Sequence, residues 1–583
     1  MEKNGFMKVA AKALLYTFSL VGVLCIMLLM MVSRLLMPQM ETRAVVGENS
    51  VLLIDFNRSF PEIGHQDIIS EISGGTPISL YELLGAIETA QNDKNISALF
   101  AQIDDTDLGA AQVQEVRNAI KKFRESGKKA YVYSQGFGSF GGGFSEYYLA
   151  SAFDEIWMQP KSMIGITGIS VEVPFARGLL QKIGIEPEIY ARYEYKSAAA
   201  SFTDYTMSPV YRKEMQSLVN DFGNTVVDQI TQDRSIDAKS VRKYVDLAPL
   251  FAEDGLDKKL IDRIGYKAEL FAEMRNPQVI SVYDYAKNVY EQKLKNEVAL
   301  VFLEGVINSG ESAENGIYDD ATIGSDTVLR QLEEIGENSR IKALVLRINS
   351  PGGSYTAANE IWYALNKLKA DKKIPIVVSQ GDYAASGGYF ISLPADAIFT
   401  EQLSLTGSIG VFGGKPVVKG LMQKLGVSWN EVNFGKNASI MSLNHKFGPA
   451  ERAIYNKSLD AVYNDFVQKV SEARNIDIKK MDKLARGRVW SGKQAVENGL
   501  ADEIGGIDEA LAKAAELAQL EKYTTVVYPK QKSLQEKFAE FFSNQTNISV
   551  NKMMNILGFD SQEIKILKNL YNNAAVLPIV IKM

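Results

Sequence analysis

The stretch Gly381-Asp382-Tyr383-Ala384-Ala385-Ser386-Gly387-Gly388-Tyr389 stands between two apolar runs, residues 374–378 before it and residues 390–393 after it. A run rich in β-branched residues, a serine among alanines and glycines, and renewed apolar sequence predict a strand, a turn and the start of a buried helix. Ser386 would then lie at a helix N-terminus, where backbone N–H groups stabilise negative charge. The position suits a nucleophilic hydroxyl, although an N-cap or a small packing residue fits the same local pattern.

A second turn with unusual composition lies upstream. The apolar residues 343–348 predict a buried strand that runs directly into Asn349-Ser350-Pro351-Gly352-Gly353. Glycines after a proline leave backbone amides uncovered by side chains, which is what an oxyanion hole needs. We therefore expect the backbone of Gly352, Gly353 and Gly387 to supply such a site.

Together the two glycine-rich turns resemble those of the Clp/crotonase-type fold. With residues 405–411, Leu-Thr-Gly-Ser-Ile-Gly-Val, the chain is similar over nearly its whole length to the signal peptide peptidase A (protease IV) family of bacteria, in its long, duplicated form. The resemblance implies a serine endopeptidase with a Ser-Lys dyad and no cofactor, assembled as a bowl-shaped homotetramer. The implied substrates are cleaved signal peptides and other unfolded apolar segments.

The chain contains an internal repeat. Three strand-like segments of the first half recur in the second half in the same order, namely 51–56 with 298–303, 96–103 with 341–348, and 128–136 with 373–381. Helical patterns lie between them, and this alternation predicts an α/β fold with largely parallel sheets covered by helices. By resemblance, residues 50–290 and 297–525 form two tandem Clp/crotonase-like domains of repeated ββα-type units, and residues 526–583 form a C-terminal helical extension.

The two halves differ where the chemistry is expected. The first half has no Gly-Gly turn in residues 104–109, and aligning Tyr147 with Tyr389 places Phe144 opposite Ser386. Ser139 and Ser145 lie nearby, but neither has a matching upstream turn. The nucleophile is therefore predicted only in the second half.

A serine hydroxyl needs a neighbouring proton acceptor to become a good nucleophile. The chain has only two histidines, His65 and His445, and neither stands beside a recognisable partner. The plausible acceptor is a lysine whose ammonium form is disfavoured by burial. Lys196, among aromatic and small residues in Tyr-Glu-Tyr-Lys-Ser-Ala-Ala-Ala, matches this description.

The resemblance supports Lys196, because the long form of the family pairs a C-terminal serine with an N-terminal lysine. Lys436 remains an alternative base, since aligning Pro209 with Pro449 places it opposite Lys196, and single-domain members take both groups from one domain. The resemblance also implies that Ser408 orients the lysine by a hydrogen bond.

The amino-terminal segment predicts membrane attachment. Residues 13–33 carry no charge and are long enough to span a bilayer as a helix. The lysines in residues 1–12 favour a cytoplasmic N-terminus. We expect a retained single-pass anchor in the bacterial inner (cytoplasmic) membrane, with the catalytic domains on the periplasmic, extracytoplasmic side.

The composition excludes several classes of protein function. Among 583 residues, 64 are Lys or Arg and 70 are Asp or Glu, and no basic block of the kind found in nucleic-acid-binding proteins occurs. Cys25 is the single cysteine, so an intrachain disulfide and a cysteine zinc site are excluded, and two histidines make a histidine metal site improbable. Two alternatives stay open: an acyl-CoA enzyme of the crotonase type, disfavoured by the apolar N-terminal segment, and a non-catalytic membrane-anchored scaffold.

Overall fold

The computed structural model describes residues 22, 45–63, 77–138, 142–288, 294–313 and 321–530. The described residues from 45 onward belong to one compact unit. Apart from Gly22, the predicted anchor at 13–33 lies outside the described residues, as does nearly all of the predicted extension at 526–583. Within the described part, no helix combines the length and apolar character that crossing a bilayer requires.

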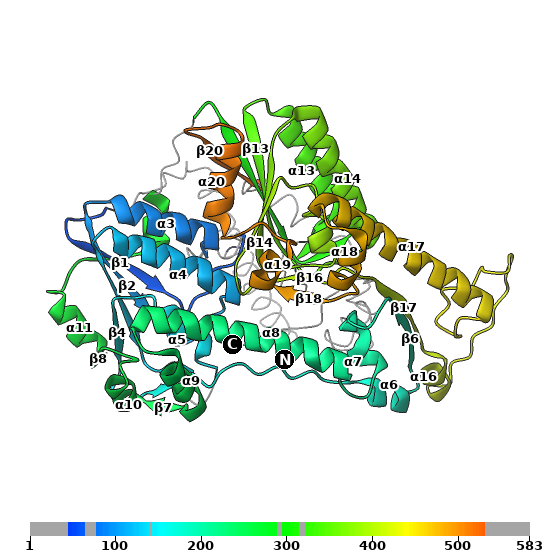
Figure 1. Cartoon of the computed structure of the whole chain (residues 1–583), viewed down its shortest axis with the longest axis horizontal. Helices are drawn as coiled ribbons and strands as arrows, with labels where there is room; N and C mark the ends of the chain where they lie inside the picture. Colours follow the sequence, from blue (N-terminus) through cyan, green and yellow to red (C-terminus); the bar gives the residue numbers. More distant parts are fainter. Residues whose placement is uncertain are drawn as a thin grey trace, which may run out of the picture. The chain divides into compact units, whose positions relative to one another are not determined.

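The first half of the chain builds a sheet in which every pair of neighbouring strands is parallel, in the order β8-β4-β3-β2-β1-β9. Its strands are β1 (Ser50–Asp55), β2 (Ile96–Gln102), β3 (Lys129–Ser134), β4 (Glu155–Met158), β8 (Arg263–Ile264) and β9 (Val279–Ser281). Helices α3 (Leu80–Asn92), α4 (Ala110–Glu125) and α5 (Phe144–Ala150) connect the early strands. Figure 1 shows the early strands and helices of this half in blue and cyan and its later elements in green.

The second half repeats this strand order as β19-β15-β14-β13-β10-β20. In addition, β16 pairs with β14, and β18 pairs with β16. The strands are β10 (Glu297–Glu304), β13 (Ile341–Ser350), β14 (Ile376–Ala385), β15 (Ala397–Thr400), β16 (Leu405–Gly407), β18 (Val489–Ser491), β19 (Glu503–Ile504) and β20 (Thr524–Tyr528). The pairing is parallel except between β16 and β18. The domain boundary predicted at residue 525 falls inside strand β20, which continues to Tyr528. The whole strand belongs to this domain, because it pairs with β10 at the edge of the sheet.

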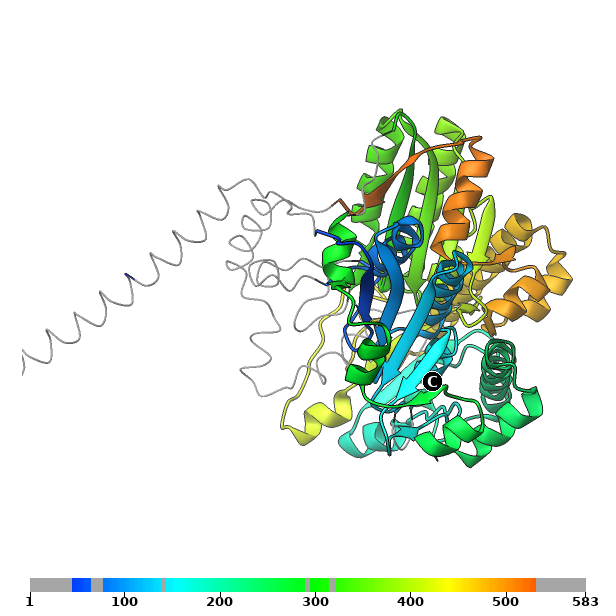
Figure 2. The same cartoon turned by 90° about the vertical axis from the view of Figure 1, so that its left-hand side faces the viewer.

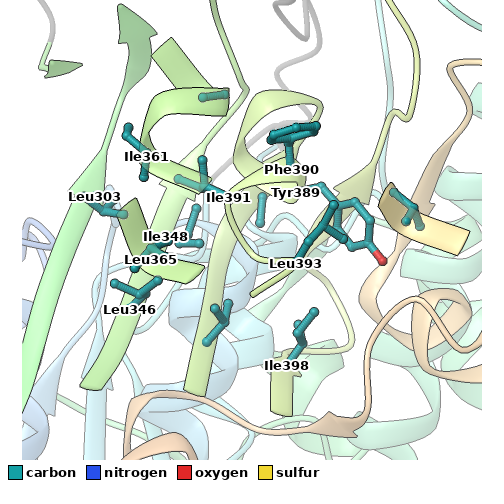
Figure 3. Close-up of a cluster of buried hydrophobic side chains, with 14 of the residues drawn as sticks. Leu303, Leu346, Ile348, Ile361, Leu365, Tyr389, Phe390, Ile391, Leu393 and Ile398 are labelled. Carbon is teal, nitrogen blue, oxygen red and sulfur yellow. The ribbon is translucent and has the colours of Figure 1, made fainter. Parts of the chain in front are cut away.

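The sheet of the second half is buried on both faces, as parallel sheets generally are. Helices α13 (Ser325–Glu337), α14 (Tyr355–Lys372) and α17 (Pro449–Arg474) cover one face, and α20 (Ile507–Leu517) covers the other. Figure 3 shows part of the first core, with side chains from β10, β13 and α14 packed toward those that follow Ser386: Leu303, Leu346, Ile348, Ile361, Leu365, Tyr389, Phe390, Ile391 and Leu393. This packing holds the chain after Ser386 in the core.

Three further elements join the halves. Strand β6 (Glu186–Ala191) of the first half pairs antiparallel with β17 (Phe412–Val417) of the second. Helix α8 (Pro209–Arg234) is capped by Ser208 and has proline at its first position, a favoured helix start. In Figure 1 it runs from the first half to beneath β16 and β18 of the second half, and it contacts β18. Figure 2, turned by 90°, shows the same part of the molecule from the side.

A buried ion cluster also ties the halves together. The Arg347 guanidinium on β13 pairs with Glu62, at 2.8 Å, and with Glu115 on α4, at 2.6 Å. All three side chains are almost fully buried. The second Glu115 oxygen accepts a hydrogen bond from the Ile507 amide at the start of α20. Buried charges persist only when they are paired, so this cluster constrains how the two sheets meet.

Arg347→Met is expected to destabilise the protein strongly, because it leaves two buried carboxyl groups without their counter-charge. Loss of one partner from a buried ion pair costs about 3–5 kcal/mol. Thermal unfolding followed by circular dichroism should show a clearly lower midpoint than the wild type. The matched control is Arg330→Met, which removes the exposed pair with Glu311 and should leave the midpoint unchanged. Equal midpoints for the two variants would contradict a structural role for the cluster.

Candidate active site

Ser386 lies where β14 ends and the short helix α15 (Gly387–Phe390) begins. The predicted strand at 374–378 is longer in the structure, because β14 continues through Ala385 alongside β16. Ser386 is 1% exposed and has φ 56° and ψ −115°, a backbone conformation that residues with a side chain rarely adopt. Such backbone costs of order 1–3 kcal/mol and occurs mainly at functional sites. The turn therefore holds the hydroxyl in one fixed position.

Lys196 of the first half reaches this serine. Its Nζ lies 3.0 Å from Ser386 Oγ, 3.0 Å from Ser408 Oγ and 2.9 Å from the Ser408 carbonyl oxygen. The lysine is 4% exposed, so all three contacts are shielded from water. Ser408 follows β16 and, like Ser386, has a positive φ, of 51°. The structure thus brings together Ser386, Lys196 and Ser408.

Burial lowers the pKa of Lys196 to about 7, and the nearby Glu214 carboxyl opposes this shift. A neutral amine has two N–H donors and one lone pair. Two donors directed at Ser408 would leave the lone pair facing Ser386 Oγ, where it can accept the hydroxyl proton. The ammonium form has three donors, which match the same three oxygens. The site can therefore hold the lysine in either protonation state.

The loop before β18 positions both Lys196 and Ser408. The Arg486 carbonyl accepts a hydrogen bond from the Tyr195 amide, and the Arg488 carbonyl accepts one from the Ser408 amide. Between them, Gly487 has φ 85°, and a Cβ built there would lie 2.5–2.6 Å from backbone and Cβ atoms of Lys196. Only glycine allows the lysine backbone to approach this closely.

Two backbone amides point to an oxyanion site. The Gly353 and Gly387 amides have no hydrogen-bond partner among the described residues, and a Cβ built on Gly387 would lie 3.2 Å from Gly353 N. The Gly352 amide differs from expectation, because it donates to Ser350 Oγ at 3.2 Å. Gly352 instead has φ 105°, which the turn requires. The Gly353 and Gly387 amides, but not the Gly352 amide, are therefore available to an added acceptor.

The other sequence candidates lie elsewhere. Lys436 is exposed in the segment between α16 (Lys419–Lys424) and α17, and its side chain makes no hydrogen bond within the described part of the chain. His445 lies in the same segment and contacts the Lys446 carbonyl oxygen and Ser439. Ser139 and His65 fall outside the described residues. Among the residues that the structure describes, no group of three or more His, Cys, Asp or Glu could hold a metal ion.

The first half contains a corresponding site without a serine. Tyr147 and Tyr389 donate equivalent hydrogen bonds of 2.7 Å, to the carbonyl oxygens of Leu260 and Leu500. This equivalence supports the alignment that places Phe144 opposite Ser386. Phe144 is fully buried. The first half therefore contributes a lysine to the site but no nucleophile of its own at this position.

An apolar pocket lies beside Ser386. Its walls come from α14, α15, α17 and the segment after Ser408, with Tyr355, Ala358, Phe390, Val411, Val462 and Phe466 as the apolar lining. Sequence reasoning did not identify these residues, because they meet only in the fold. The lining is apolar, so this small space beside the nucleophile favours apolar over charged groups.

Sequence reasoning also did not identify Glu214, a buried residue near Lys196, although its position in the sequence indicates burial. It lies on the side of α8 that carries the buried Tyr211, Leu218 and Phe222, at helical spacing of three to four residues. A charged residue at such a core-facing position is unusual.

Gly487→Ala is expected to displace Lys196 and to reduce the reactivity of Ser386 toward a fluorophosphonate probe by about a hundredfold, the effect of misplacing a reacting group by about 1 Å. The rate of labelling measures this. Gly127→Ala is the matched control, because Gly127 has φ 86° and nothing within 4 Å of an added Cβ. Both variants carry the same backbone strain, so equal labelling rates would show that contact with Lys196 is unimportant.

Comparison with known proteins places this site in a family. The pattern of Peptidase family S49 matches residues 122–280 and 368–521, once in each half. Protease 4 of Salmonella typhi is 31% identical over 468 residues, which are 76% of this chain and 73% of that protein. Protease 4 of Haemophilus influenzae is 31% identical over 79% of this chain and 77% of its own length. A putative signal peptide peptidase SppA of Enterococcus faecium is 34% identical over 40% of this chain and 67% of its own length. The chain therefore belongs to peptidase family S49 and is a serine peptidase related to the Protease 4 proteins.

Proposed function

We propose that the protein is an endopeptidase that works with a Ser-Lys dyad, in which Ser386 is the nucleophile and Lys196 is the general base. The observation that carries this proposal is the 3.0 Å contact between Lys196 Nζ and Ser386 Oγ in a site shielded from water. With a pKa of about 7, a substantial fraction of Lys196 is neutral near neutral pH and able to accept a proton. Ser408 orients the amine through its side-chain and backbone oxygens.

The proposed reaction proceeds in two halves. Ser386 Oγ forms a bond to the scissile carbonyl carbon while its proton passes to Lys196 Nζ. The carbonyl oxygen becomes an oxyanion that accepts hydrogen bonds from the Gly353 and Gly387 amides. When the carbon–nitrogen bond breaks, the Lys196 ammonium gives its proton to the leaving amine. Water then attacks the acyl-serine with Lys196 again as base, releasing the carboxyl product and restoring Ser386.

The pocket beside Ser386 supports a preference for apolar residues on the acyl side of the cleaved bond. An apolar lining excludes charged side chains, because their desolvation would not be compensated. Nearly complete burial of the dyad requires that the substrate enter as an extended, unfolded segment. We therefore propose cleaved signal peptides and other unfolded apolar segments as substrates, in keeping with the name of the Enterococcus relative.

We further propose the setting that the sequence predicts. Residues 13–33 anchor the chain in the bacterial inner membrane, and the catalytic part lies on the periplasmic side as a homotetramer. Residues 50–290 and 297 to about 528 correspond to two Clp/crotonase-like domains, supported by their shared strand order. An acyl-CoA enzyme and a non-catalytic scaffold are less consistent with the family membership and with the geometry of the dyad.

Replacing members of the dyad tests this function. Ser386→Ala should abolish both fluorophosphonate labelling and peptide cleavage. Lys196→Met, which keeps the buried chain but removes the base, should lower the labelling rate by about 10²–10⁴, the usual contribution of a general base. Lys436→Met should label like the wild type. Full labelling of Lys196→Met, with loss in Lys436→Met, would reassign the base.

Filling the pocket tests substrate preference. Val462→Phe should lower kcat/KM for peptides with an apolar residue before the cleaved bond by about 10–200-fold, the effect of a small steric misfit in a pocket. Labelling by a small fluorophosphonate should change little. Ile454→Phe, on an exposed part of α17, is the control and should cleave like the wild type. An unchanged kcat/KM for Val462→Phe would show that the pocket does not receive the substrate.

A further inference from the structure

We propose that Asp382 is a positioning residue for this reaction, because its side chain caps helix α4 of the first half and so fixes the strand that ends at Ser386. The inference rests on the proposed function of Ser386 and deepens it. Asp382 makes no hydrogen bond to Ser386 or Lys196 within the described part of the chain. It therefore acts through the backbone of β14 and not on the reacting atoms.

Strand β14 carries a bulge shortly before Ser386. In the pairing of β13 with β14, Asn349 alone stands opposite the three residues 381–383. A bulge bends its strand, and bulges are over-represented next to active sites, where they re-aim a side chain. The path of the chain into Ser386 therefore depends on how this bulge is held.

Two side-chain contacts hold the bulge, and they come from different halves of the chain. Asn349 Oδ1 accepts a hydrogen bond of 3.1 Å from the Tyr383 amide. Asp382 Oδ1 accepts a hydrogen bond of 2.8 Å from the Ala111 amide, near the start of α4. Asn349 thus ties the bulge to its own sheet, whereas Asp382 ties it to the first half.

Helix α4 has no N-cap side chain of its own, because the residue before it is Gly109. The first amides of a helix have no partner within the helix, and an N-cap Ser, Thr, Asn or Asp usually satisfies one of them. A Cβ built on Gly109 would lie 2.0 Å from Asp382 Oδ2. The carboxyl group thus occupies the space that an N-cap side chain would need, and it performs the same task from the other half of the chain.

Helix α4 contacts both strands whose ends form the active site. Its Glu115 pairs with the buried Arg347 on β13, and β13 leads into the turn that supplies the Gly353 amide. Its first turn is capped by Asp382 on β14, and β14 leads into Ser386. The helix therefore constrains the two strand ends relative to each other.

The link from Asp382 to the nucleophile is short. Residues 383–385 pair with β16, and the Ser386 amide donates a hydrogen bond of 2.8 Å to the Gly407 carbonyl oxygen at the end of β16. Because only these three residues separate the cap from the nucleophile, a shift of Asp382 displaces Ser386 relative to Lys196. Misplacing a reacting group by about 1 Å costs about a hundredfold in rate.

The rate of Ser386 labelling by a small fluorophosphonate in the full-length protein tests this role. Asp382→Ala should lower the rate by about 10–100-fold, because the bulge loses its tie to α4. Asp382→Asn keeps an oxygen for the Ala111 amide and should label at a rate close to that of the wild type, since Asn and Asp cap helices about equally well. A wild-type rate for Asp382→Ala, or equally low rates for both variants, would overturn the proposal.

A double variant separates positioning from helix capping. Gly109→Ser combined with Asp382→Ala gives α4 a cap of its own, in the space that the carboxyl group leaves. Gly109 has φ −70° and ψ 168°, an extended conformation typical of an N-cap serine. The thermal unfolding midpoint should recover relative to Asp382→Ala, while labelling stays slow because β14 is no longer tied to α4. Recovery of the labelling rate as well would show that Asp382 is only a helix cap. The double variant also decides the question if Asp382→Ala alone fails to fold.

Asp237→Ala is the matched control. Asp237 caps helix α9 (Ala238–Leu247) by accepting a hydrogen bond of 3.0 Å from the Ser240 amide, so both of these residues belong to the first half. Its loss should lower the unfolding midpoint but leave the labelling rate unchanged. A rate as low as that of Asp382→Ala would assign the effect to general destabilisation and refute the positioning role.

The two levels of inference fail differently. If Ser386→Ala still labels like the wild type, the proposed Ser-Lys function itself is wrong. If labelling depends on Ser386 and Lys196 but not on Asp382, only the role of Asp382 is wrong.

Discussion

The exclusion of water from one amine is the constraint on which the rest of the site depends. Lys196 is useful as a base only while its neutral form is populated, and burial is what lowers its pKa to about 7. An amine buried in this way must still satisfy its polar atoms. Ser386 and Ser408 do so with three oxygens at 2.9–3.0 Å, and both serines adopt rare backbone conformations to reach it.

This constraint explains why the two halves of the chain are held together so firmly. The base comes from the first half and the nucleophile from the second, so any sliding between them would misplace the amine relative to the hydroxyl. The pairing of β6 with β17 and the buried pairs of Arg347 with Glu62 and Glu115 all cross this boundary. Buried ion pairs are costly to form, but they favour one relative arrangement over others that would leave charges unpaired.

The two halves keep one architecture but divide the chemistry. Equivalent tyrosines anchor equivalent short helices, yet Phe144 occupies in the first half the place that Ser386 occupies in the second. Phe144 fills its position with apolar volume where the second half has a reactive hydroxyl. The first half instead provides the segment around Lys196 and helix α8 with Glu214. Duplication therefore supplied a scaffold for positioning as well as a second copy of the fold.

The amino-acid sequence by itself determined the local features of this protein. The repeated apolar runs predicted parallel sheets, and small residues around Ser386 predicted the strand, the turn and the helix, because such preferences depend on neighbouring residues. The family resemblance was needed to choose between Lys196 and Lys436. The Gly352 amide was expected to serve an oxyanion hole, but it donates a hydrogen bond to Ser350 Oγ, a contact that depends on side-chain geometry. Only the tertiary structure decided which lysine is buried against Ser386, and that Glu214 and the apolar pocket lie nearby. The physical reason is that desolvation and charge pairing depend on atoms far apart in the chain, which sequence patterns do not place next to one another.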